Sequence, residues 1–151
     1  MRELKFRGKL LNNSDSFKTY KKGTIIQGGF CNQGSKTFIV AHFNVFEVQP
    51  ESVSQFTGSK DKNGKDIYEG DIIKVIGATE VYYDDSLFEP SENVGFELLT
   101  EVFYNETIAS FDLSTIEADL NMKHWGFYGE GTESHLEVIG NIHEPPELIN
   151  Y

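Results

Sequence analysis

Short runs of β-branched and aromatic residues, separated by Gly, Asn, Asp and Pro, make up most of the hydrophobic pattern of this chain. The periodicity of an amphipathic helix is weak nearly throughout, whereas short apolar runs bounded by turn residues are typical of strands. The pattern therefore predicts a mainly β protein of strands and hairpins. The predicted strands are Leu4–Leu10, Gly23–Gly28, Thr37–Phe43, Ser52–Thr57, Asp71–Ile76, Glu80–Asp84, Gly95–Tyr104, Ile108–Leu113 and His135–Asn141.

The clearest local signal is the polar segment Asp61–Asp66, which contains Asn63-Gly64. Asn-Gly adopts the positive φ angles of a type I′ turn at little cost, so the segment predicts a tight hairpin or an exposed turn. Gly70, just before the apolar strand at Asp71–Ile76, predicts a bend or a close backbone approach.

One short helix is predicted near residues 115–122. Ser114 and Glu117 have the spacing of a capping box, and Ile116 and Leu120 form a narrow apolar stripe behind them. Gln49-Pro50 is the predicted boundary between an N-terminal β-rich extension, residues 1–49, and a larger domain, residues 50–151. The length of 151 residues suits one domain with such an appendage.

The net charge of −11 is divided unevenly along the chain. Residues 1–75 have a net charge of +4, and residues 76–151 have a net charge of −15 with Lys123 as their only basic residue. One interpretation is a solvated face that keeps the protein in solution. The other is a charge dipole that steers partners or favours self-association, so a homo-oligomer is a further expectation.

Compartment signals favour the cytoplasm. The single cysteine, Cys31, cannot form an internal disulfide, and a reducing compartment suits it. Charges interrupt the first seven residues too early for a signal peptide, and no apolar run approaches the roughly 20 residues of a membrane span.

No motif identifies a reaction. Residues 29–37 resemble a P-loop, but Ser35 separates Gly34 from Lys36 and a strand pattern follows, which favours a glycine-rich hairpin loop. Asp66, Glu69 and Asp71 could hold Mg²⁺ in a metal-dependent phosphodiesterase, although Asp and Glu are also common around turns. No catalytic, cofactor or metal-binding residue is therefore assigned, and none of the histidines has metal-ligand spacing. These histidines are His42, His124, His135 and His143.

A basic N-terminal arm is the candidate nucleic-acid interface, since basic residues among aromatic ones can contact the backbone and stack on bases. The acidic remainder of the chain would repel phosphates. The arm consists of Arg2, Lys5, Arg7, Lys9, Lys18, Lys21 and Lys22 among Phe6, Phe17 and Tyr20.

Three segments, Met1–Arg7, Val48–Ile73 and Leu136–Leu148, resemble the opening, the signature and the ending of the YopX family of phage and prophage proteins. Ser59 departs from the signature, which has an apolar residue at that position, and residues 77–134 depart further. The resemblance implies a partly open SH3-like β-barrel in the C-terminal part. It implies no catalytic or ligand residue, because the molecular role of the family is uncharacterised.

The leading functional prediction is a non-enzymatic accessory protein that binds a host or phage protein in the bacterial cytoplasm. The lack of a convincing catalytic motif and the acidic surplus, which suits a basic partner, both favour it. The alternatives are a nucleic-acid-binding protein that uses the basic arm and a metal-dependent phosphodiesterase. No cofactor and no membrane partner are predicted.

Overall fold

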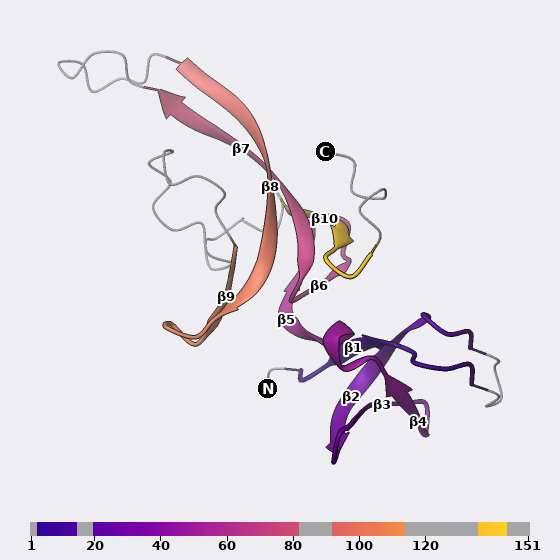
Figure 1. The fold of residues 1–151 in the computed structure, drawn as a ribbon. Coiled ribbons are helices and arrows are strands. Elements are labelled where there is room, and N and C mark those ends of the chain that lie inside the picture. The colour runs from indigo at the N-terminus through magenta and orange to yellow at the C-terminus, as the bar shows by residue number, and fades with distance from the viewer. Residues whose placement is uncertain (1–2, 15–19, 82–91, 114–135, 145–151) are drawn as a thin grey trace. The chain divides into compact units, whose positions relative to one another are not determined.

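The computed structural model describes residues 3–14, 20–81, 92–113 and 136–144 (Figure 1). The chain forms two compact units, which are treated separately below. The first unit contains residues 1–58 and 66–69, and the second contains residues 59–65 and 70–151.

The first unit is built on an antiparallel sheet with the strand order β4-β3-β2-β1-β5-β6. A 3-10 turn, η1 (Pro50–Ser52), precedes β5. The strands are β1 (Phe6–Lys9), β2 (Ile25–Gln33), β3 (Lys36–Ala41), β4 (Asn44–Val48), β5 (Ser54–Lys60) and β6 (Asp66–Tyr68).

One face of this sheet forms a hydrophobic core. In β3, buried Thr37, Ile39 and Ala41 alternate with more exposed residues, as expected of a strand with one face in the core. The buried cluster is completed by Leu10, Ile26, Phe46 and Val48, against which Phe6, Tyr20 and Val53 pack.

The chain just after β1 returns to the far end of β4. Leu10 forms an isolated antiparallel bridge with Val48, and the Leu11 N–H donates to the Glu47 carbonyl at 3.0 Å. The sheet therefore curls, so that the segment after β1 approaches β4. The contact is an isolated bridge, and β4 and β6 remain the edge strands of the sheet.

The second unit contains an antiparallel sheet with the order β10-β7-β8-β9. Figure 1 shows β7 and β8 as the two long arms of a hairpin, paired from Ile72–Glu101 to Val81–Glu92. The strands are β7 (Asp71–Val81), β8 (Glu92–Asn105), β9 (Ser110–Leu113) and β10 (Leu136–Asn141). The inner face of this sheet buries Ile73, Val75, Val102, Phe111, Leu136 and Val138.

The predicted mainly β class is confirmed, and the described residues contain no α-helix. The helix expected near residues 115–122 lies outside them. Neither sheet closes into a barrel within the described ranges. The predicted domain boundary at Gln49-Pro50 stays a prediction.

The main error of the strand prediction is at Thr37–Phe43. The strand ends at Ala41, and His42 and Phe43 form a two-residue turn into β4. Neither this turn nor β4 was predicted. Both turn residues have positive φ, 50° and 62°, as in a type I′ turn. Positive φ is uncommon for any residue other than glycine, and for a bulky residue such as Phe43 it is an outlier, so the sequence did not predict this turn.

The turn at Asp61–Lys65 is present, but its type differs from the prediction. The Gly64 N–H donates to the Asp61 carbonyl at 2.9 Å, and of Asn63 and Gly64 only Gly64 has a positive φ, 80°. This is the pattern of a three-residue loop in which a glycine in the left-handed region follows a type I turn. Gly70 also has a positive φ, 74°, which confirms the predicted bend.

Candidate functional site

The outer face of the second sheet collects carboxylates from three strands. Residues opposite one another in an antiparallel pair lie on the same face, and the face alternates along each strand. The pairs Ile72–Glu101, Ile76–Glu97, Phe103–Asp112 and Lys74–Glu137 therefore share one face. It is the face opposite the buried core residues.

This outer face is mixed in character. Half-buried apolar side chains lie between the carboxylates, including Ile72, Leu99 and Phe103. Within the described strands, Lys74 is its only basic residue, and it pairs with Glu97 at 2.7 Å. Glu137 pairs with Lys62 of the neighbouring turn at 2.7 Å. We call the set Ile72, Leu99, Glu101, Phe103 and Asp112 the acidic face.

Asp112 is held in place locally. Its carboxylate accepts hydrogen bonds from the Leu113 N–H at 2.9 Å and from the Asn105 side-chain amide at 3.4 Å. The acidic face therefore presents carboxylates at positions that the strands determine, which is the arrangement that a basic and partly apolar surface would complement.

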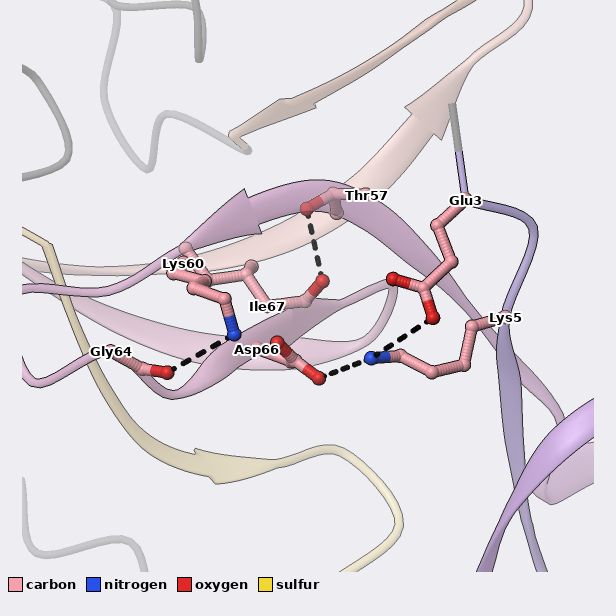
Figure 2. A network of polar contacts seen from close by, with 7 residues as sticks. All are labelled: Glu3, Lys5, Thr57, Lys60, Gly64, Asp66 and Ile67. Carbon is pink, nitrogen blue, oxygen red and sulfur yellow. Dashed lines mark hydrogen bonds and ion pairs between the residues drawn. The ribbon is translucent and has the colours of Figure 1, made fainter. Parts of the chain in front are cut away.

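Lys5, a residue of the candidate nucleic-acid interface, is paired with carboxylates of the protein itself. Figure 2 shows its ammonium between the carboxylates of Glu3 and Asp66. It donates a hydrogen bond to Asp66 Oδ2, lies 4.0 Å from Glu3 Oε1 and stands 4.4 Å from the centre of the Phe56 ring. The hydrogen bond to Asp66 raises the pKa of Lys5 above its ordinary value, against an opposite effect of burial.

Arg7 is also directed inward. Its side chain is buried, and the guanidinium stands 4.6 Å from the centre of the Tyr68 ring, a cation–π geometry. Burial raises the pKa of the Tyr68 hydroxyl, and the positive charge of Arg7 partly offsets this increase. Of the other basic residues of the arm, Lys9 is half-buried, and Lys21 and Lys22 are exposed. Arg2 and Lys18 lie outside the described residues.

The three carboxylates weighed as a metal site are divided between the two units in the sequence. Asp66 and Glu69 belong to the first unit, and Asp71 belongs to the second, where it is fully buried at the start of β7. Among the residues that the structure describes, no group of three or more His, Cys, Asp or Glu side chains could hold a metal ion.

The glycine-rich segment resembling a P-loop is a hairpin, as expected. Gln33 pairs with Lys36 across a two-residue loop in which Gly34 has a positive φ of 62°, and β3 follows it directly. The helix N-terminus that binds phosphate in such a loop is replaced here by a strand.

Asp61 is the residue whose role the sequence did not reveal. Its buried carboxylate accepts hydrogen bonds from the N–H groups of Asn63, Lys65 and Val138 at 2.8, 2.9 and 3.1 Å. Burial alone raises the pKa of Asp61, but the bonds from Val138, Lys65 and Asn63 and the charge of Lys65 bring it below its ordinary value. Because three backbone N–H groups donate to this one carboxylate, Asp61 holds the turn in place against β10.

These features define an all-β protein with two antiparallel sheets, one of which presents carboxylates among apolar side chains. The family model described as "YopX protein" matches residues 6–150. The chain belongs to the YopX family. No curated protein matches it. Among the described residues, no helix is long and apolar enough to cross a membrane.

Proposed function

We propose that this protein is a non-enzymatic accessory protein of phage or prophage origin that binds a basic partner protein in the bacterial cytoplasm. The supporting observation is the acidic face, where Glu101 and Asp112 stand beside Ile72, Leu99 and Phe103 on a regular sheet. Charges guide association and select the partner, while half-buried apolar groups supply area that a complex can bury.

The charge of the whole second unit supports the same conclusion. It contains 5 lysines against 18 aspartates and glutamates, a net charge of −13, whereas the first unit has a net charge of +2. A field of this size accelerates encounter with a basic partner and weakens as salt is added. The fold proposal that accompanies this function is an SH3-like, partly open barrel from residue 50 onward, which an experimental structure of the full chain would test.

The test is a pull-down from host lysate with the full chain as bait, at low and at high ionic strength. A matched pair of variants makes it specific. Glu101→Gln/Asp112→Asn removes two charges from the acidic face, and Glu3→Gln/Glu51→Gln removes two exposed charges from the first unit.

We expect the wild type and the control to retain the same basic protein at low salt and to release it as salt rises. The acidic-face variant should retain at least about tenfold less of it, the change that corresponds to about 1.4 kcal/mol. Equal retention by all three baits, or retention that salt does not change, would contradict the proposal.

A further inference from the structure

The turn at Asp61–Lys65 contains the only Asn-Gly dipeptide of the chain, Asn63-Gly64. Asparagine is among the residues that are lost chemically on heating, because the backbone nitrogen that follows it can attack its side-chain amide. Glycine leaves that nitrogen unhindered, since it has no Cβ. Asn63 is exposed, so water reaches its side chain. The dipeptide is therefore a candidate site of spontaneous deamidation.

The reaction at such a site needs only water. The Gly64 nitrogen forms a bond with Cγ of Asn63, the bond from Cγ to Nδ2 breaks, and the Gly64 proton leaves with the amide group as ammonia. Water then opens the resulting succinimide ring at one of its two carbonyl carbons. One opening gives an aspartate. The other gives an isoaspartate, in which the main chain runs through the former side chain and is longer by one carbon.

The fold opposes the first step by engaging the backbone around the nucleophile. The consecutive N–H groups of Asn63, Gly64 and Lys65 all donate to Asp61. The first and third reach its carboxylate at 2.8 and 2.9 Å, and the second reaches its carbonyl oxygen at 2.9 Å. Ring closure requires the Gly64 nitrogen to give up its proton and to turn toward the Asn63 side chain, which breaks its bond to Asp61.

Asp61 is itself held, so the turn opens only when several hydrogen bonds break together. Its buried carboxylate also accepts from the Val138 N–H at 3.1 Å, and the Lys62 N–H donates to the Leu136 carbonyl at 2.9 Å. The Gly64 nitrogen is therefore released only in the minority of molecules in which the turn has opened locally. When the turn recloses faster than the reaction proceeds, the rate of deamidation follows the population of that open form.

We propose that Asn63 is a modification site gated by Asp61. The folded turn protects it, and opening of the turn exposes it to irreversible deamidation. The extra backbone carbon of isoaspartate displaces the following N–H groups from Asp61, and either product adds a negative charge to a turn built around a carboxylate. Modification at Asn63 therefore weakens the hold of the turn on β10. This proposal does not depend on the acidic face, so the two succeed or fail independently.

The experiment follows deamidation of the full chain at mildly alkaline pH, by peptide mapping with mass spectrometry and by enzymatic methylation of isoaspartate. Wild type in urea gives the rate for the open chain. Asp61→Ala removes the acceptor. The matched control is Val102→Ala, which removes buried atoms from the core of the second unit and leaves the hydrogen bonds of the turn in place. Circular dichroism establishes that each variant is folded under the conditions of the assay.

We expect Asn63 to deamidate at least about tenfold more slowly in folded wild type than in urea, and at least about tenfold faster in Asp61→Ala than in Val102→Ala. Asp61→Asn, whose amide oxygen can still accept, should react faster than folded wild type and more slowly than the unfolded chain, and it carries the test if Asp61→Ala does not fold. Equal rates for folded and unfolded wild type, or equal acceleration by Asp61→Ala and Val102→Ala, would overturn the proposal.

The products provide a second readout. Ion exchange separates the isoaspartate form, and urea unfolding compares it with Asn63→Asp, which has the added charge without the extra carbon. The isoaspartate form should unfold at a lower urea concentration than Asn63→Asp, and Asn63→Asp at a lower one than the wild type. An isoaspartate form as stable as the wild type would show that modification does not loosen the turn, and would overturn the proposal.

Discussion

The Asp61 carboxylate accepts a hydrogen bond of 3.1 Å from the backbone N–H of Val138, 77 residues further along the chain. The same carboxylate closes the turn by accepting from Asn63 and Lys65. One side chain therefore shapes the turn and fastens it to β10. The Lys62 N–H reinforces this connection by donating to the Leu136 carbonyl at 2.9 Å.

Replacing Asp61 should destabilise the second unit. Asp61→Ala should lower the free energy of unfolding by about 2–3 kcal/mol, because it leaves three backbone N–H groups without their acceptor. Asp61→Asn should cost less, since its amide oxygen can still accept. Urea unfolding measures both changes, with Glu106→Ala at an exposed turn position as a control expected to stay within about 0.5 kcal/mol. An Asp61→Ala variant as stable as the control would contradict the fastening role.

The low pKa of Asp61 predicts a loss of stability in acid. The folded-state pKa lies below the ordinary value of 3.8, so the contribution of this group is complete above that value and is lost as the pH falls through the folded pKa. The free energy of unfolding should therefore decrease more steeply below about pH 4 in the wild type than in Asp61→Asn. Parallel curves from pH 6 to pH 3 for the two proteins would refute this assignment.

The Lys5–Asp66 ion pair should stabilise the first unit. Both side chains are about four-fifths buried, and Lys5 also stands over Phe56. A double-mutant cycle with Lys5→Met and Asp66→Asn should give a coupling energy of about 1–2 kcal/mol. Glu3, which is 67% exposed and 4.0 Å from Lys5, should couple to it by less than about 0.5 kcal/mol.

The pH dependence of that coupling has the opposite sign to that of Asp61. The pKa of Lys5 is raised above 10.5, so the contribution is complete below the unfolded value and is lost as the pH rises through the folded one. Repeating the cycle at alkaline pH should show the coupling decline only above about pH 10.5. A coupling that is already lost at neutral pH would show that the pair contributes nothing to stability.

The strained β3–β4 turn predicts a variant more stable than the wild type. Placing Asn-Gly at His42 and Phe43 should raise the free energy of unfolding of the monomer by about 1 kcal/mol or more, because both residues then suit positive φ. Unfolding at protein concentrations where the chain is monomeric measures this change. Ala109, with a φ of 51°, offers a comparison, because Ala109→Gly should give a gain for the same reason. A loss of stability in both variants would show that strain at these turns is negligible.

Local sequence was sufficient to predict the β class and several turns. Gly34 and Gly70 have the positive φ values that glycine adopts without cost, and the Asp61–Lys65 turn lies where Asn63-Gly64 indicated it. The alternation in β3 likewise indicated a strand with one buried face. These features depend on neighbouring residues, so they can be predicted without the rest of the chain.

Only the tertiary structure decided which residues meet. Lys5 and Arg7, part of the candidate nucleic-acid interface of the alternative function, are directed to Asp66, Phe56 and Tyr68 because β1 pairs with β5, which lies beside β6. The turn at His42 and Phe43 was missed because strand pairing and core packing impose a positive φ on Phe43, a conformation that is an outlier for a bulky residue.

The acidic face and the fastening by Asp61 depend on strand register in the same way. A shift of one residue would move Glu101 and Asp112 to the core face, and the register of β7 on β8 pairs residues that are far apart in the sequence, as in Ile72–Glu101. The sequence by itself therefore determined the β class, most of the strands and the charge of this protein. The pairing of those elements over long distances determined which charges face solvent together and which are buried.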